Sequence, residues 1–183
     1  MTHNFIFFDF NGVLDNGEHL NGHTMDVIRK TADFNKLLLL FKFALETESF
    51  FISISTYNSV TDTMTLCYDT FLKEHSNELT QEELNKLDEL YEASAFYSYT
   101  LSKDDIIFEV IYDYCEEHNI KKEDLNIVSF EDQEELTDLA NQVWVNPSDG
   151  LTDENIANAS GILKGKFNYT QALGRTKRHK ANK

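Results

Sequence analysis

Apolar and polar positions along the chain follow two patterns: short continuous apolar runs, and longer segments with helical spacing. Four short runs indicate strands, and the first of them is continuously apolar, which is typical of a strand buried on both faces. They are NFIFFDF (residues 4–10), SFFISIS (49–55), LNIVSF (125–130) and QVWVNP (142–147). We therefore expect four strands in a sheet that is covered on both sides.

Between these runs, four segments carry apolar residues every three or four positions, the spacing of an amphipathic helix. Two have sequence signals for a helix start: Thr80 stands three residues before Glu83, and Ser102 precedes a periodic run. Strand and helix alternate, so we predict an α/β fold, a three-layer Rossmann-like parallel sheet with helices on both faces. The predicted helices are residues 24–46, 80–97, 102–120 and 132–142.

Polar side chains stand where three of the predicted strands end. Asp9 ends the first, Ser55 and Thr56 the second, and Glu131 and Asp132 the third. In open parallel sheets, ligands bind beyond the carboxyl ends of the strands. These residues are therefore the first candidates for a functional site.

The order of these motifs resembles that of the haloacid dehalogenase-like (HAD) superfamily, whose members are mostly phosphatases. The stretch FIFFDFNGVLD (residues 5–15) is similar to the first motif of the family, a hydrophobic strand that ends in Asp-x-Asp-Gly. FFISISTYNS (50–59) resembles the second motif, and the stretch from Ser102 to Asp132 resembles the third and fourth. The resemblance covers roughly residues 4–147 and implies a minimal cap.

The resemblance implies a mechanism. Asp9 would be the nucleophile that attacks phosphorus and forms an aspartyl-phosphate. Ser55 or Thr56 would donate a hydrogen bond to a phosphoryl oxygen, and Lys103 would balance its charge. Without a site, the same segments have simpler interpretations: a buried strand with an Asn-Gly turn, and an ordinary lysine in the first turn of a helix.

The resemblance also implies a Mg²⁺ site, formed by Asp9, the main-chain carbonyl of Asn11 and an acid at the fourth motif, because Mg²⁺ prefers oxygen ligands. Glu131 fits that motif best, and Asp132 is the alternative in a shifted register. An acidic helix start without a metal is the simpler interpretation of this segment. Two positions depart from the family pattern. Phe130 replaces a glycine, and Asn11 replaces the aspartate that transfers protons, a loss that typically costs about 10²–10⁴-fold in rate.

The chain of 183 residues is long enough for one domain, which we place at residues 1–160, followed by a basic tail at 161–183. No run approaches the roughly 20 apolar residues of a membrane span. The N-terminus lacks the features of a signal peptide, and two cysteines, Cys67 and Cys115, form no metal-binding spacing. We expect a cytosolic protein without a membrane partner.

Charge is divided unevenly along the chain, whose net charge is −16. No acid follows Glu154, while seven of the 16 bases do, so the residues up to Glu154 carry a net −23. Such a body repels nucleic acid, whereas a basic terminus is attracted to phosphates. A solvated terminus is the simpler interpretation, and a nucleic-acid contact through the tail is the alternative. The candidate contact residues are Arg175, Lys177, Arg178 and Lys180.

Two functions follow. In the first, a HAD-like protein with impaired or lost phosphohydrolase activity acts as a binding or regulatory protein on a macromolecular partner. A chain rich in Asn, Lys, Phe and Tyr with a single proline is typical of an AT-rich genome, so this role would suit a viral factor acting on host transcription. In the second, the protein is an active Mg²⁺-dependent phosphatase acting on nucleotides, nucleic-acid ends or phosphoproteins.

Overall fold

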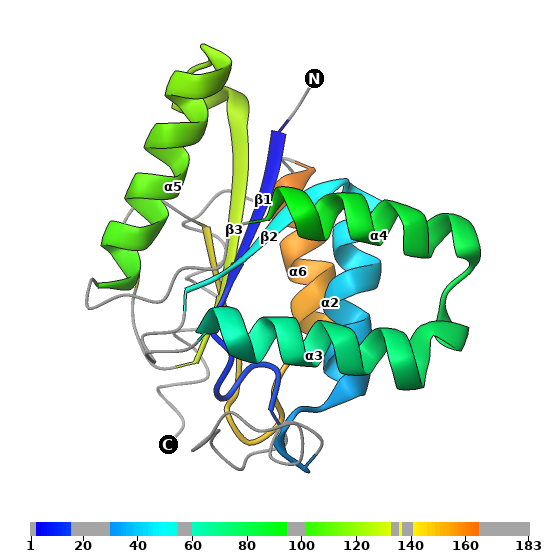
Figure 1. The fold of residues 1–183 in the computed structure, drawn as a ribbon. Helices are drawn as coiled ribbons and strands as arrows, with labels where there is room; N and C mark the ends of the chain where they lie inside the picture. Colours follow the sequence, from blue (N-terminus) through cyan, green and yellow to red (C-terminus); the bar gives the residue numbers. More distant parts are fainter. Residues whose placement is uncertain are drawn as a thin grey trace.

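The computed structural model describes residues 3–15, 30–54, 60–94, 102–132, 136 and 141–164, with backbone alone at 60–62. These residues form a parallel four-stranded sheet and five α-helices (Figure 1). The strands are β1 (His3–Phe8), β2 (Ser49–Ser53), β3 (Leu125–Glu131) and β4 (Asn141–Trp144). The helices are α2 (Phe34–Thr47), α3 (Val60–His75), α4 (Gln81–Ala93), α5 (Lys103–His118) and α6 (Asp153–Leu163), with short 3₁₀ turns at Ser76–Glu78 and Lys122–Asp124. The expected α/β class with a parallel sheet is confirmed.

The sheet has the order β2-β1-β3-β4, so β1 is paired on both edges. Helix α2 connects β1 to β2, and α5 precedes β3 on the other side of β1. These two helices cover opposite faces of the sheet (Figure 1). The chain therefore runs from β1 to β2 on one side and crosses back to β3 on the other, which creates a topological switch point between the carboxyl ends of β1 and β3.

Alternate residues of β1 supply two separate cores. Phe5 and Phe7 belong to the cluster under α5, whereas Ile6 and Phe8 belong to the larger cluster under α2 and α6. Successive side chains of a strand point to opposite faces, so an apolar residue at every position is what a doubly covered strand needs. This pattern explains why the first strand is so continuously hydrophobic.

Helices α3 and α4 lie in the segment where the resemblance left room for a small cap. Phe71 of α3 packs edge-to-face on Phe41 of α2, with ring centroids 5.0 Å apart. Leu87 and Leu90 of α4 are buried in the same cluster. Both helices therefore extend the core layer on the α2 face.

The first predicted helix, residues 24–46, is interrupted, because residues 30 and 31 are helical whereas residues 32 and 33 leave helical geometry. Ala32 forms an isolated antiparallel bridge with Asp15. Asp33 has an extended backbone, and its Oδ1 accepts hydrogen bonds from the amides of Asn35 and Lys36, which makes it the N-cap of α2. Aspartate at such a position starts a helix rather than continuing it. Residues 24–29 lie outside the described residues.

The starts of the next two predicted helices are confirmed. Thr80 and Glu83 form the expected capping box at α4, and the Ser102 side chain accepts a hydrogen bond from the amide of Asp105 at α5. The predicted helix over 132–142 lies mostly outside the described residues, and its end at Asn141 belongs to β4.

Helix α6 has no counterpart among the predicted elements. Thr152 caps it in a capping box with Asn155, and the helix continues to Leu163, past residue 161, where the tail was expected to begin. Ile162 and Leu163 are buried in the main core. Among the described helices, none has both the length and the apolar character that crossing a bilayer requires.

Candidate functional site

The pairing of β1 with β3 brings two carboxylates together. Phe8 is in register with Phe130, and the amide of Asp9 donates to the carbonyl of Phe130 at 3.1 Å. Asp9 and Glu131 therefore follow neighbouring positions at the same edge of the sheet. Both continue the alternation that directs Phe5 and Phe7 toward α5, so their side chains lie on the α5 face.

Lys103, the first residue of α5, holds these carboxylates. Its ammonium lies 2.6 Å from Asp9 Oδ2 and 2.7 Å from Glu131 Oε2. The Lys103 side chain is 4% exposed and that of Glu131 is 0% exposed. Ser102 positions this contact, because its cap fixes where the helix begins.

The electrostatics of this cluster favour a charged lysine. Burial by itself lowers the pKa of Lys103, but the carboxylates of Asp9 and Glu131 outweigh that effect and hold the pKa above its ordinary value. Removing one partner from such a buried ion pair typically costs about 3–5 kcal/mol, because a charge is left uncompensated. Lys103 is thus a fixed positive charge beside Asp9.

The turn after β1 fixes the other oxygen of Asp9. Asp9 Oδ1 accepts a hydrogen bond from the amide of Phe10 at 2.7 Å. The Phe10 carbonyl accepts from the amide of Leu14, and the Leu14 carbonyl accepts from the amide of Asp33. Asn11 is buried in this turn. The turn is therefore attached to the rest of the fold by its backbone, and both Asp9 oxygens are held in place.

Gly12 gives the turn its close approach to Asp132. Its φ is +75°, and a Cβ added there would lie 2.3 Å from Asp132 Oδ2. Only a residue without a side chain allows both the left-handed backbone and this contact. The Asn-Gly turn of the sequence thus brings the Asp132 carboxylate against the loop that carries Asn11.

Asp9, Glu131 and Asp132 form a group whose carboxylate oxygens, one from each residue, all lie within 4.8 Å of one another. Three carboxylates and one ammonium leave a local charge that a divalent cation would balance. Oxygen-only donors suit hard cations of the Mg²⁺ and Ca²⁺ kind. The residues at this edge therefore could hold a metal ion.

The structure brings Asp9, Lys103, Glu131 and Asp132 together and places Asn11 in the adjoining turn. Ser55 and Thr56, predicted to contact a phosphoryl group, lie outside the described residues. The tail residues Arg175, Lys177, Arg178 and Lys180 also lie outside them.

Two features of the acidic segment at the end of β3 were not predicted from the sequence. The sequence left Glu131 and Asp132 as alternative ligands, whereas both lie near Asp9. Phe130 points to the opposite face of the sheet, where its ring packs edge-to-face against that of Phe43. Strand alternation was the available signal for Phe130, since it separates Phe130 from Glu131, whereas the approach of Asp132 to Asp9 depends on a tertiary contact.

Comparison with known proteins found no matching family model, no significantly similar curated protein and no significantly similar solved structure. The functional interpretation therefore depends on the residues of the site.

Proposed function

We propose that the chain is a HAD-like protein that binds a divalent cation and a phosphoryl group at Asp9, turns substrate over weakly or not at all, and acts as a binding or regulatory protein on a macromolecular partner. The observation that carries the proposal is the contact of the Lys103 ammonium with both Asp9 and Glu131, at 2.6 and 2.7 Å. These residues come from three segments of the chain, in the order in which the HAD motifs supply them.

In this proposal, the Asp9 carboxylate is the group that contacts the phosphorus atom of the phosphoryl group. Its two oxygens are oriented by the Phe10 amide and by Lys103. The Lys103 ammonium would balance the charge of a bound phosphoryl group, an example of a preorganised electrostatic contact. A Mg²⁺ ion held by Asp9, Glu131 and Asp132 would supply further charge neutralisation when bound.

The weak turnover in the proposal rests on Asn11. A phosphoryl transfer to Asp9 needs a group that protonates the leaving oxygen, and a later hydrolysis needs a group that activates water. An amide has no proton that it can exchange for either purpose, so Asn11 can orient a ligand but not perform acid–base catalysis. The site would therefore still bind a phosphoryl group, although the chemical steps would be slow.

An active phosphatase is the second candidate, because nucleophile, lysine and acids are all in contact. The two candidates are separated by an assay with para-nitrophenyl phosphate and Mg²⁺ on three proteins: the natural chain, Asp9→Asn and Asn11→Asp. We expect the natural chain to release no more nitrophenol than Asp9→Asn, and Asn11→Asp to gain about 10²-fold or more.

Metal-dependent release by the natural chain that is abolished in Asp9→Asn would establish the phosphatase instead. If Asn11→Asp gains nothing and Mg²⁺ does not raise the melting temperature of the natural chain, the phosphoryl and metal site itself is rejected. The melting temperature in Mg²⁺ thus provides a readout that does not depend on turnover.

A further inference from the structure

The outer face of α5 carries two exposed aromatic side chains. Phe108 is 54% exposed and Tyr112 is 51% exposed, and they are the exposed large hydrophobic residues among those that the structure describes. One helical turn apart, their rings stack with centroids 6.0 Å apart and an interplanar angle of 17°. An exposed aromatic pair of this kind is a common centre of a protein contact.

The fold does not require this pair. The inner face of α5 is completed by other residues, since Ile106, Ile107, Val110 and Ile111 are all buried against the sheet. Phe108 and Tyr112 lie on the side of the helix that faces away from that core. The two rings therefore contribute a surface feature rather than core packing.

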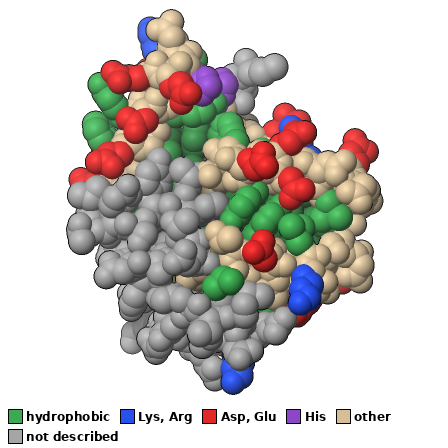
Figure 2. All heavy atoms as spheres, viewed as in Figure 1, with side chains coloured by type: hydrophobic (Ala, Val, Ile, Leu, Met, Phe, Trp, Pro, Cys, Tyr) green, Lys and Arg blue, Asp and Glu red, His purple; other side chains and the backbone are tan. Residues whose placement is uncertain are grey.

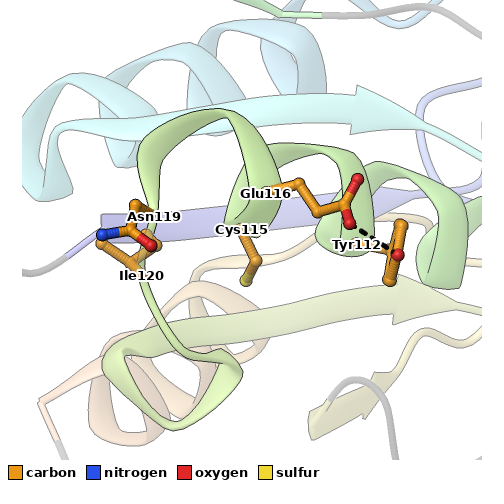
Figure 3. Close-up of a pocket in the computed structure, with 5 residues that line it drawn as sticks. All are labelled: Tyr112, Cys115, Glu116, Asn119 and Ile120. Atoms are coloured by element: carbon orange, nitrogen blue, oxygen red, sulfur yellow. Dashed lines mark hydrogen bonds between the residues drawn. The ribbon is translucent and has the colours of Figure 1, made fainter.

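The aromatic pair continues into an open depression toward the end of the helix. Tyr112 is its first lining residue, and the Tyr112 hydroxyl donates a hydrogen bond to Glu116 Oε1 at 2.7 Å (Figure 3). At 1.5 Å per residue, the helical part of this strip, from Phe108 to Glu116, is about 12 Å long. The lining residues of the depression are Tyr112, Cys115, Glu116, Asn119 and Ile120.

Acidic side chains flank the aromatic pair on α5. Helix α5 contains one lysine and no arginine, and that lysine, Lys103, is buried in the candidate site. Its exposed side chains between and beside the aromatic rings are carboxylates, and Figure 2 shows acidic side chains along this helix with hydrophobic ones between them. The exposed acids of α5 are Asp105, Glu109, Asp113, Glu116 and Glu117.

We propose that this outer face of α5 (Phe108, Glu109, Tyr112, Asp113 and Glu116) docks a basic, arginine-containing segment of a partner protein. A guanidinium group stacks on aromatic faces and pairs with carboxylates at the same time, which matches stacked rings flanked by acids. The same face of a second copy fits poorly, because it would present the same acidic side chains. Nucleic acid is repelled from this face for the same reason.

The inference names the partner chemistry for the binding role proposed above and rests on that role, but it does not require chemistry at Asp9. The aromatic pair is on the outer face of α5, whereas Lys103 points inward to the carboxylates. Substitutions at Phe108 and Tyr112 can therefore be tested separately from the candidate site.

The test measures fluorescence anisotropy of labelled peptides with the full chain. Three peptides of equal length are used, alternating leucine with arginine, with lysine or with glutamate. We expect the arginine peptide to bind several-fold more tightly than the lysine peptide and the glutamate peptide not to bind. Phe108→Ser/Tyr112→Ser should weaken binding of the arginine peptide about tenfold, a difference of the size that loss of one or two contacts produces.

A charge-matched pair of variants provides the control. Glu109→Gln/Asp113→Asn removes two charges from α5, and Glu82→Gln/Glu89→Gln removes two exposed charges from α4. The α5 variant should lose about tenfold in affinity and the α4 variant less than twofold. Equal losses, or no effect of the aromatic substitutions, would mean that the acidic body attracts any polycation, and the proposal would be rejected.

Two further measurements separate the possible occupants and the two proposals. Concentration-dependent dimerisation in analytical ultracentrifugation that Tyr112→Ser abolishes would replace the basic partner with a second copy. Asp9→Asn should remove the Mg²⁺-dependent rise in melting temperature and leave peptide affinity unchanged. Loss of peptide binding in Asp9→Asn, with a native circular dichroism spectrum, would contradict a docking surface separate from the site.

Discussion

At the scale of single residues, Gly12 allows the turn after β1 to lie against the carboxylate of Asp132. Its positive φ and its contact with Asp132 are two separate requirements, and both exclude a side chain. Gly150 has a similar φ of +64°, but an added Cβ there would meet the flexible side chain of Lys36. The two glycines therefore form a matched pair, of which only Gly12 lies against an acid of the candidate site.

We predict that Gly12→Ala and Gly150→Ala each destabilise the fold by about 1 kcal/mol or more, because alanine is strained at positive φ. Only Gly12→Ala should also reduce the Mg²⁺-dependent rise in melting temperature, since Asp132 must move away from the new Cβ. Urea denaturation and thermal melts with and without Mg²⁺ measure the two effects. An equal response to Mg²⁺ in both variants would show that Asp132 is not a ligand.

At the scale of elements, the candidate site is made where a helix start meets two strand ends. Ser102 sets the first residue of α5, and the β1–β3 register sets Asp9 beside Glu131. None of these elements alone holds the cluster. A substitution in the helix cap should therefore alter the contact of Lys103 with the two carboxylates.

The matched caps of α5 and α4 test this coupling. Ser102→Ala and Thr80→Ala should each lower the free energy of unfolding by about 1 kcal/mol, the usual value of an N-cap side chain. Ser102→Ala alone should weaken the response to Mg²⁺, because a frayed first turn moves Lys103. Isothermal titration with Mg²⁺ compares the variants, and an unchanged affinity in Ser102→Ala would mean that the sheet positions Lys103 without help from the cap.

Sequence signals between neighbouring residues predict much of this arrangement. They do not predict contacts between residues that are distant in sequence. The Ser102 and Thr80 caps and the apolar strand 4–10 involve neighbouring residues, so the sequence predicts them. Asp33 also caps a helix, but it stands inside a continuous helical pattern. The preceding residue, Ala32, forms its bridge with Asp15, which is distant in sequence. The approach of Asp132 to Gly12 depends on the same kind of tertiary contact, which periodicity does not encode.

At the scale of the whole molecule, one buried thiol links stability to alkaline pH. Cys67 is fully buried in α3, and burial raises its pKa from 9.0 to about 12. In the unfolded chain this thiol ionises near pH 9, whereas in the folded chain it stays protonated. Its contribution to stability is therefore complete below pH 9 and is lost as the pH rises toward 12.

Between pH 8 and pH 10 this single group should lower the free energy of unfolding by about 1.4 kcal/mol. Cys67→Ala is less stable at both values because it leaves a small cavity, but its decline over this interval should be smaller by that amount. Urea denaturation of both proteins at the two pH values provides the comparison. Parallel declines would show that the Cys67 thiol does not couple to folding.

The division of charge between body and terminus leads to a second prediction at this scale. Removing residues 174–183 deletes Arg175, Lys177, Arg178 and Lys180, so retention on single-stranded nucleic acid at low salt should fall, and with it the steepness of the salt dependence. A chain with glutamine at the same four positions controls for length. Retention that survives both changes would exclude the tail as a nucleic-acid contact.

The central place of β1 in the sheet also bears on how the protein is made. Its two neighbours are β2 and β3, so β1 is synthesised before both of its partners and completes its pairing only when β3 has been made. Asp9 leaves the ribosome more than a hundred residues before Glu131, and no nascent chain short of that length can assemble the cation-binding edge. During translation the phenylalanines of β1 therefore stay exposed until β3 has been made. A prematurely terminated product would be prone to aggregation and would not be a weakly functional protein.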